Sequence, residues 1–409
     1  MIAKITLENF FSFGGPTTVE LNAGINMLVG INGSGKSNML KAVKMLYEGV
    51  VGEGFEKIFL KNWSGFTAVA NFNQTQEDYI RLTFEFDRNA IKKAVDNRGY
   101  RFSRNPVYEI TIFRLGSTSY YLKEKIYAES IHEGQSAFIF MEMENAEGII
   151  STREGGKTGI QRYPHEKKQI SFKASELVLR QISDPDRFYP LFTLKRALEQ
   201  FAVYDYFDTT AESAIRQPGS YTIEERLWPN GENLLSVLLR IKNHHALAYE
   251  KIEQYIKRIN PHFKDINFDI IGSKLFLVLR EQYLSRSVSI EHISDGTLHY
   301  LLLLAILLNP ARGNLLCIDE PEISLHPDMI FTVAEVLKIA SEDHSQLIVA
   351  THSPLLLNAF DLDEIYVFEK NQHNETEVHT KTESDFKQWQ NEYLAGQLWL
   401  QGLIGGKRW

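Results

Sequence analysis

Hydrophobic residues in the C-terminal third of the chain alternate between short unbroken runs and longer segments with helical spacing. The unbroken runs have the length of buried strands: 315–318, 347–350 and 365–368. The helical patterns lie before and between them: 296–308, 327–340 and 354–359. Because parallel strands are buried on both faces and are joined by helices, this alternation predicts an α/β fold with a mostly parallel sheet.

The first part of the chain predicts more strands than helices. Residues 25–29 form a short buried strand pattern, and residues 37–47 follow with helical spacing. Two further strand candidates lie at 66–72 and 79–86. Alternating runs then recur between 107 and 163, separated by short polar or glycine-bearing breaks, which predicts an antiparallel β-meander.

The middle of the chain is predicted to be largely helical. Three helical patterns are present: 174–181, 186–202 and 232–259. Pro261 ends the last of them, and two short strands are expected at 268–271 and 275–279. No heptad pattern is long enough for an extended coiled coil, so any arm is short.

Residues Gly30 to Ser37 form a glycine-rich loop of the pattern G-x4-G-K-S, directly after a predicted strand and before a predicted helix. In that context, backbone N–H groups surround phosphates and the helix N-terminus adds positive charge. Lys36 would reach the β- and γ-phosphates, and the Ser37 hydroxyl would bind Mg²⁺. A glycine-rich turn with a solvated lysine is the alternative. The expected ATP-binding residues are Asn32, Gly33, Ser34, Gly35, Lys36, Ser37 and Asn38.

The apolar strand at 315–318 ends in two carboxylates, Asp319 and Glu320. Parallel strands of an α/β sheet present their C-terminal ends to the ligand. Asp319 would hold Mg²⁺, and Glu320 would polarise the attacking water as a general base. An acidic turn after a strand is common by itself, but its combination with the phosphate loop favours the catalytic interpretation.

Ser294, Asp295 and Gly296 precede an apolar helix and lie shortly before the acidic strand. Alone, such a turn is most simply a helix cap. Its position instead fits the signature segment of an ABC-type ATPase, whose N–H groups and serine hydroxyl meet the γ-phosphate held by the opposing subunit.

Two further segments follow the acidic strand. His352 comes directly after the strand predicted at 347–350 and could sense the γ-phosphate as a hydrogen-bond partner. Ser324 and His326 fit a loop that crosses the dimer interface in such ATPases.

Composition indicates where in the cell this chain functions. The chain has 409 residues, a net charge of −8 and a single cysteine, Cys317, within an apolar strand. A single cysteine excludes an internal disulfide framework, which predicts a reducing, cytoplasmic location. The longest apolar run, Leu298 to Leu308, is far shorter than the roughly 20 residues of a membrane span. We therefore expect no membrane partner.

The segments GINGSGKS, ISDGT, LLCIDEPEISLHPD and THSP together resemble the ABC-type ATPases of the RecF/SMC-like class. The resemblance is closest to compact proteins often called AAA family ATPases, some associated with DNA repair and others with anti-phage defence. It implies an α/β ABC-ATPase head, a P-loop NTPase, with a mixed sheet, a β-rich insertion and a short helical arm. It also implies ATP and Mg²⁺ as cofactors and a homodimer, or a higher oligomer, that forms on ATP.

The resemblance extends to the domain organisation and to a glutamine. A nucleotide-binding lobe would comprise 1–86 and 310–409, and residues 87–309 would form the β-meander and a helical lobe with the signature. Gln181 would contact the metal and the attacking water, with Gln74 and Gln76 as rivals.

One signature residue departs from the pattern of many ABC-type ATPases. Asp295 stands where those signatures have a glycine. A carboxylate near a γ-phosphate is unfavourable unless it points away or caps the helix. We therefore expect slower hydrolysis, or closure that depends more on a partner.

An aromatic segment and two basic clusters each have two possible interpretations. Asn9 to Phe13 either supply adenine contacts, as the loop after the first strand does in similar proteins, or pack as core aromatics. The basic clusters at 88–104 and 153–180 either contact DNA or RNA or form a solvated face.

The sequence predicts an ATP-binding and ATP-hydrolysing head that dimerises on ATP and couples closure and opening to a nucleic-acid-related or defence process. The main alternative is an ATP-gated scaffold that holds or restrains a separate effector protein with little turnover. A transporter ATPase subunit fits less well, because the long stretch between the phosphate loop and the signature is not expected there.

Overall fold

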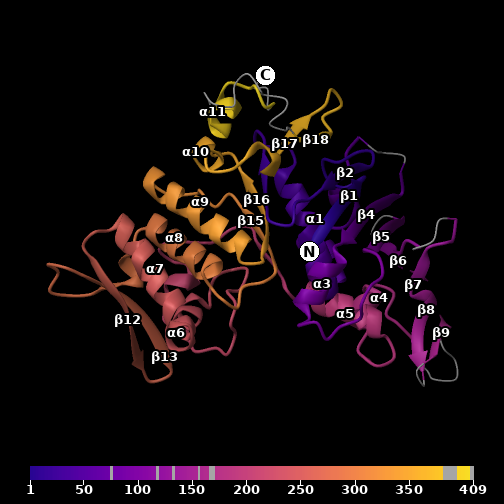
Figure 1. Ribbon diagram of the computed structural model, residues 1–409, viewed down its shortest axis with the longest axis horizontal. Helices are drawn as coiled ribbons and strands as arrows, with labels where there is room; N and C mark the ends of the chain where they lie inside the picture. The colour runs from indigo at the N-terminus through magenta and orange to yellow at the C-terminus, as the bar shows by residue number, and fades with distance from the viewer. Residues whose placement is uncertain are drawn as a thin grey trace. The chain divides into compact units, whose positions relative to one another are not determined.

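The computed structural model describes residues 1–73, 77–116, 119–130, 134–154, 157–164, 171–380 and 394–405 (Figure 1). Contacts within the chain divide it into two compact units. The first unit comprises 1–23, 30–201 and 367–379. The second unit comprises 24–29, 202–366 and 380–409. Each unit therefore combines segments that are far apart in the sequence.

An eight-stranded antiparallel sheet dominates the first unit, in the order β2-β1-β4-β5-β6-β7-β8-β9. Its strands are β1 (Ile2–Glu8), β2 (Thr17–Glu20), β4 (Tyr79–Phe86), β5 (Pro106–Leu115), β6 (Ser119–Ala128), β7 (Phe138–Glu144), β8 (Glu147–Glu154) and β9 (Lys157–Tyr163). Strands β4 to β9 pair in chain order, which confirms the expected meander. In β4 every second residue is buried, as one covered sheet face requires.

The meander continues the pairing of β1 and β4, so it clusters with the N-terminal strands. This grouping differs from the sequence division, which placed 87–309 together. The sequence predicts one lobe formed by 1–86 and 310–409 and another formed by 87–309. This division into lobes stays a prediction.

The helical elements of the first unit are short apart from α1. They are α1 (Lys36–Val50), a π-helical turn (Lys57–Asn62), α2 (Phe66–Val69), α3 (Arg88–Ala94), α4 (Val178–Gln181) and α5 (Tyr189–Leu198). The strand expected at 66–72 is wrong, because Phe66–Val69 form a helical turn after Gly65, whose φ is 77°. A short apolar run with two alanines does not distinguish strand from helix.

A carboxyl group is buried in the first unit between the sheet and α4. Glu124 on β6 accepts hydrogen bonds from the Tyr108 hydroxyl at 2.5 Å and from the backbone N–H groups of Val178 and Leu179 at 2.5 and 3.4 Å. Burial raises the pKa of Glu124 to about 7, although these hydrogen bonds oppose the rise. Glu124 therefore anchors the start of α4 and titrates near neutral pH.

Replacing Glu124 by glutamine is expected to flatten the pH dependence of stability. Because the folded-state pKa is raised, the stabilisation from this group is full below pH 4.5 and is lost as pH rises through about 7. The difference corresponds to about 3 kcal/mol in the free energy of unfolding. Urea unfolding between about pH 5 and about pH 8 measures it. Glu147→Gln, at an exposed position, is the matched control. An unchanged slope in Glu124→Gln would show that Glu124 does not titrate in this window.

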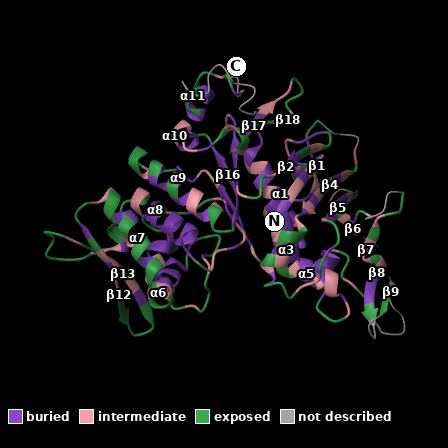
Figure 2. Ribbon diagram, viewed as in Figure 1, coloured by how far each residue is buried: buried purple, intermediate pink, exposed green. Residues whose placement is uncertain are grey.

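The second unit is built around parallel strands of a six-stranded sheet with the order β10-β15-β16-β3-β17-β18. The strands of this sheet that lie in the second unit are β3 (Ile25–Val29), β15 (Leu315–Asp319), β16 (Gln346–Thr351) and nearly all of β10 (Phe201–Tyr204). The order of the sheet is completed by β17 (Ile365–Lys370) and β18 (Thr376–Thr380). β15 pairs parallel with β16, and β16 pairs parallel with β3. All residues of β16 and β3 are buried, as the unbroken apolar runs predicted (Figure 2).

In the second unit α9 (Pro327–Glu342) packs against β16 and β3, and two further helices, α8 (Asp295–Leu307) and the short α10 (Pro354–Leu357), pack against α9. Figure 1 shows α8 beside α9. Every residue from Leu298 to Leu307 in α8 is buried, because the helix lies between other elements on all sides.

The remaining elements of the second unit form a helical pair and a small sheet. They are β11 (Gly219–Ser220), α6 (Leu234–His244), α7 (Ala246–Ile259), β12 (Phe263–Ile271), β13 (Lys274–Glu281), β14 (Val288–Ser289), α11 (Ala395–Leu400) and three 3₁₀ turns (Ala214–Arg216, Ile290–His292 and Leu362–Glu364). The single helix expected at 232–259 is two helices, because the chain leaves helical geometry at His245, where φ is −138° and ψ is 58°.

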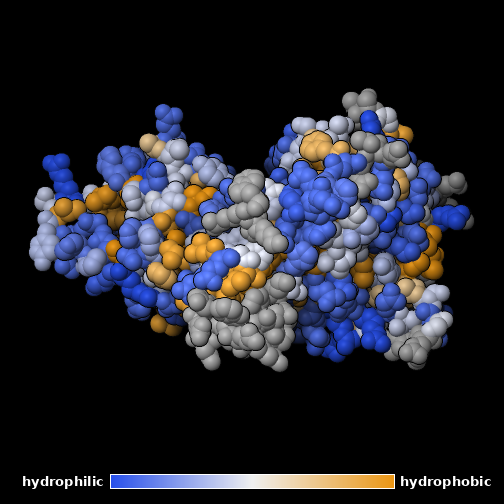
Figure 3. Space-filling model, turned by 90° about the horizontal axis from the view of Figure 1, so that it is seen from above, coloured by the Kyte–Doolittle hydropathy of each residue, from blue (hydrophilic) through white to orange (hydrophobic). Residues whose placement is uncertain are grey.

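The surface mixes hydrophilic residues with separate hydrophobic patches on the face seen in Figure 3. Exposed hydrophobic residues of the second unit include Ile323 and Phe331. None of the helices in the described ranges is both long and apolar enough to span a membrane. The thiol of Cys317 is fully buried in β15, and burial raises its pKa.

Candidate nucleotide and signature sites

The phosphate loop follows β3 in the chain and leads into α1. Gly33 and Gly35 have φ values of 82° and 110°, a region that residues with a Cβ rarely adopt. The Lys36 ammonium donates hydrogen bonds to the carbonyl oxygens of Gly30 at 2.8 Å and Ile31 at 3.3 Å. It is therefore held inside the curve of the loop, where loops of this kind bind phosphate.

Two side chains distant in sequence support the loop from outside. The Thr376 hydroxyl donates to the Ser34 carbonyl oxygen at 2.7 Å and lies 2.7 Å from the Ser12 hydroxyl. The Asn38 amide donates to the same Ser12 oxygen at 2.8 Å. A Cβ on Gly35 would lie 2.2 Å from the Thr376 hydroxyl oxygen, so this position needs glycine. The sequence analysis missed Thr376, since it lies 342 residues from Ser34.

A cavity of about 180 Å³ lies beside the start of α1. It is lined by Phe11, Ser12, Asn38, Asn71, Phe72, Asn73, Lys370 and Asn374. Phe10 and Phe13 are fully buried, whereas Phe11 faces the cavity. Two aromatics of this stretch therefore belong to the core, Phe11 and Ser12 line the cavity, and adenine contact by Asn9 to Phe13 stays a prediction.

The acidic residues of the second unit lie at the aligned ends of β15 and β16. Asp319 is opposite Ala350 in the parallel register. A Glu320 carboxylate oxygen lies 3.2 Å from His352 Nδ1, and the Glu320 N–H donates to the Ala350 carbonyl at 2.8 Å. Glu320 has a φ of 48°, which is uncommon for a residue with a side chain. Such backbone strain clusters at functional sites.

Glu322 fixes the position of His352, and the sequence analysis did not single it out. Its carboxylate accepts hydrogen bonds from the Thr351 hydroxyl at 2.6 Å and from the His352 N–H at 3.0 Å. Glu322 is 8% exposed. Its sequence signal is a second carboxylate two residues after Glu320, but spacing alone does not reveal burial. The structure therefore brings Glu320 and His352 together, and Glu322 holds His352 in place.

The signature turn caps α8 and remains exposed. The Ser294 hydroxyl accepts from the Thr297 N–H at 3.2 Å, so the expected cap is present. Ser294 and Asp295 are exposed. A Cβ on Gly296 would lie 2.5 Å from the Ser324 carbonyl oxygen, so glycine allows the loop at Ser324 to pack against the turn. The structure thus joins two of the segments expected at a dimer interface.

His326, the other residue of the expected interface loop, lies at the start of α9. The side chain of His326 is 68% exposed. Its Nδ1 accepts from the Asp328 N–H at 3.4 Å at the start of α9. Ser324 has a φ of 61°, which turns the chain between β15 and α9.

A cavity of about 230 Å³ joins the signature turn and the acidic strand within the second unit. Its lining includes Asp205, Thr209, Thr210, Asp295, His299, Asp319, Glu320 and Ser324. Burial lowers the pKa of His299 to about 4, and a hydrogen bond with the Pro321 backbone opposes this shift. His299 is therefore neutral at neutral pH and lies edge-on to Phe207, with ring centroids 5.9 Å apart.

The carboxamide of Gln181 bonds to its own segment. Its oxygen accepts from the Lys173 N–H at 2.8 Å, and its nitrogen donates to the Lys173 carbonyl at 3.0 Å. These bonds close the loop before α4, and a metal contact of Gln181 stays a prediction. Gln74 and Gln76 lie outside the described residues.

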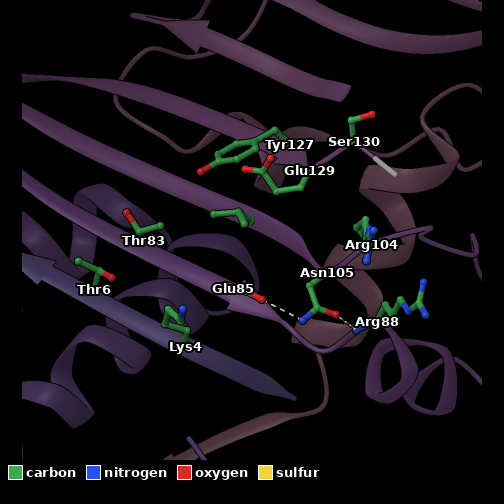
Figure 4. A pocket seen from close by; sticks show the side chains of 11 residues that line it. Lys4, Thr6, Thr83, Glu85, Arg88, Arg104, Asn105, Tyr127, Glu129 and Ser130 are labelled. Carbon is green, nitrogen blue, oxygen red and sulfur yellow. Dashed lines mark hydrogen bonds between the residues drawn. The ribbon is translucent and has the colours of Figure 1, made fainter. Parts of the chain in front are cut away.

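Two arginines of the first basic cluster line a cavity of about 660 Å³ at the sheet of the first unit (Figure 4). Arg88 and Arg104 share it with Lys4, but Glu85 and Glu129 also line it. The lining is therefore of mixed charge, and nucleic-acid contact by this cluster stays a prediction.

Two solved structures of SMC heads match nearly the whole chain. One, an SMC head bound to the C-winged helix domain of ScpA, covers 94% of this chain and 99% of that chain at 16% identity, with a TM-score of 0.54. The other is an Smc head domain with an extended coiled coil, bound to the C-terminal domain of ScpA derived from Pyrococcus furiosus. It covers 96% of this chain and 98% of that chain at 14% identity, with a TM-score of 0.53. At such identities the likeness shows the fold.

A curated relative matches a shorter stretch. The structural maintenance of chromosomes protein 3 homolog of Plasmodium falciparum (isolate 3D7) is 34% identical over 101 residues. The match spans 24% of this chain and only 8% of that protein.

A family model matches residues 25–358, which include the phosphate loop, the signature turn and the acidic strand. With the SMC heads, it confirms the expected α/β P-loop fold and the RecF/SMC-like class of ABC-type ATPases. The chain has the fold of an SMC-type ATPase head, and the family match supports an ATP-binding ATPase in general. The chain belongs to the family described as "AAA domain, putative AbiEii toxin, Type IV TA system".

Proposed function

We propose that this chain hydrolyses ATP with Mg²⁺ in a composite site that is completed by a second copy of the chain. One copy supplies the phosphate loop, Asp319, Glu320 and His352. The other supplies the signature turn, with Ser294 and Gly296 directed at the γ-phosphate. Hydrolysis reopens the dimer, so ATP drives a cycle of closing and opening.

The observation that carries this proposal is the exposed signature turn at the N-terminus of α8. A turn that only capped a helix would need no glycine-mediated packing against the Ser324 loop. The N–H groups at a helix start and a serine hydroxyl form a site for an anion. Because the turn is exposed, a phosphate carried by another subunit can reach it.

Each side chain has a distinct role in the proposed reaction. Lys36 binds the β- and γ-phosphates, and the backbone of Asn32 to Asn38 surrounds them. Glu320 orients and deprotonates the attacking water, and His352, 3.2 Å from it, contacts the γ-phosphate. Ligand-driven closure follows if ATP binds the closed dimer more tightly than the open one.

The residues present fit a magnesium ion that arrives with the nucleotide. Within the described ranges, no three histidine, cysteine, aspartate or glutamate side chains converge on a metal site. Magnesium commonly needs only one or two protein oxygens when substrate phosphates supply others. Ser37 and Asp319 are the protein ligands in this proposal, and the ion would neutralise the phosphate charge.

A composite site predicts that specific ATPase activity depends on protein concentration. At low concentration the subunits separate and turnover per chain falls; at high concentration it reaches a plateau. The expected rise is about tenfold or more across the dissociation constant of the ATP-bound dimer. Steady-state phosphate release over a dilution series measures it. Activity per chain that is constant over a range in which light scattering shows dissociation would contradict the proposal.

A scaffold with little turnover is the second candidate, and Asp295 within the signature favours it. The scaffold would hold a separate effector protein in the ATP-bound state. Turnover that remains very slow without any partner, together with stable co-purification of another protein, would favour the scaffold. Stimulation of turnover by DNA or RNA would favour a nucleic-acid-dependent motor.

The cellular setting proposed here is cytoplasmic, with DNA repair or antiviral defence as the process served. The single buried cysteine is consistent with a reducing compartment. Purification with and without ATP, followed by identification of bound protein and nucleic acid, tests this setting.

A further inference from the structure

The carboxylate in the signature turn poses an electrostatic problem for the proposed function. Asp295 is the first residue of α8, where a negative charge favours the helix dipole. The same charge would oppose a γ-phosphate brought to this turn by another subunit. A neighbouring cation is needed if the turn is to accept an anion.

Arg216 supplies that cation from a buried position. Its side chain is 3% exposed, and one terminal nitrogen donates to an Asp295 carboxylate oxygen at 2.6 Å. The other terminal nitrogen donates to the carbonyl oxygens of Ile290 at 2.9 Å and Ile293 at 2.6 Å. Both carbonyls precede the signature turn, so one guanidinium holds the turn's backbone and its charged side chain together.

The same guanidinium reaches a third segment. Its Nε donates to the carbonyl oxygens of Thr209 and Thr210 at 2.9 and 3.1 Å. Thr209 and Thr210 line the 230 Å³ cavity that also contains Asp319 and Glu320. Arg216 therefore links the signature turn to the segment after β10, beside the acidic strand.

We propose that Arg216 is the positioning residue of the signature turn: it neutralises Asp295 and fixes the turn in the form that accepts the γ-phosphate of the opposing subunit. This inference rests on the proposed function. It explains how an aspartate is compatible with an ATP-dependent signature, since the ion pair carries no net charge. It also assigns a function to a buried arginine that lies 79 residues from its carboxylate partner.

Geometry explains why this position holds arginine. The acceptors lie on three segments and in different directions, and a planar guanidinium has five N–H donors to serve them. A lysine ammonium has three donors at one point and cannot reach all of these acceptors together. Arg216→Lys therefore keeps the charge and loses the fixed geometry.

The test uses a Glu320→Gln parent, in which ATP-bound dimers should persist, and compares Arg216→Met with Arg216→Met/Asp295→Asn. Dimerisation against subunit concentration is followed by light scattering in saturating ATP and Mg²⁺. Arg216→Met should weaken dimerisation at least about tenfold, because an uncompensated carboxylate then faces the phosphate. Adding Asp295→Asn should recover most of that loss. Arg216→Lys should fall between the parent and Arg216→Met.

A purely structural arginine predicts a different outcome, in which Asp295→Asn recovers nothing. That result in a folded Arg216→Met variant would overturn the inference. ATP binding to each monomer is measured in parallel and should stay within about threefold of the parent, because the signature acts on the other subunit's nucleotide. If the Glu320→Gln parent itself does not dimerise on ATP, the proposed function fails, whatever Arg216 does.

A pair of surface variants decides the question if the Arg216 variants do not fold. The side chain of Asp295 is 59% exposed, so replacing it should not disturb the core. Asp295→Asn and Asp295→Ala both remove the charge, but only asparagine keeps an acceptor for Arg216. In the same parent, the alanine variant should dimerise about fivefold more weakly than the asparagine variant. Equal dimerisation by the two variants would contradict a positioning role for the Arg216 contact.

Discussion

Replacing Glu320 by glutamine should lower ATP turnover by about a hundredfold or more, because loss of a general base typically removes a factor of that size. Glutamine keeps the size of the side chain and can still contact His352, but it cannot take a proton from water. Equilibrium binding of ATP should change less than about threefold, since Glu320 acts on the attacking water rather than on the nucleotide. Phosphate release and nucleotide binding are measured separately.

Glu342→Gln is the matched control for Glu320→Gln. It makes the same chemical change at an exposed position on α9 and should retain full turnover. Near-normal turnover in Glu320→Gln would show that another group activates the water and would remove Glu320 from the catalytic role.

Replacing Lys36 by alanine should weaken ATP binding by about a hundredfold, with turnover falling at least as far. Lys36 is 5% exposed and its ammonium lies against the carbonyls of the phosphate loop, so a phosphate there meets it with little screening by water. Loss of one partner from a buried, hydrogen-bonded charge pair costs about 2–5 kcal/mol. Nucleotide titration followed by calorimetry measures the loss.

Lys44→Ala is the control for the lysine change, since Lys44 lies two turns further along α1. It should bind ATP with nearly unchanged affinity. A Lys36→Ala variant that is folded and binds ATP like the parent would contradict the assignment of the phosphate loop.

The parts of the site that the sequence predicts correctly are those encoded locally. The strand, loop and helix around Lys36 follow from an apolar run, glycines and helical spacing that come one after another along the chain. The Glu320 and His352 segments each follow a short apolar strand, and the parallel register aligns the strand ends. Their proximity could be expected because parallel strands meet the ligand at one edge.

Other parts depend on contacts between distant segments. Arg216 and Thr376 carry no local signal, since an isolated arginine or threonine looks the same whether it is buried or solvated. Glu322 stands within a recognised motif, but only its burial against Thr351 shows what it does. The turn at Phe66–Val69 was missed because a short pattern fits more than one structure, and the break at His245 was missed because helical segments lie on both sides of it.

The central claim is that ATP joins two copies of this chain, and light scattering of Glu320→Gln tests it most directly. A chain of 47.0 kDa should scatter as a monomer without nucleotide and as a particle of about 94 kDa in saturating ATP and Mg²⁺. An oligomer larger than a dimer that forms only with ATP would also agree with the claim. A protein that binds ATP normally and still scatters as a monomer at high subunit concentration would contradict the claim.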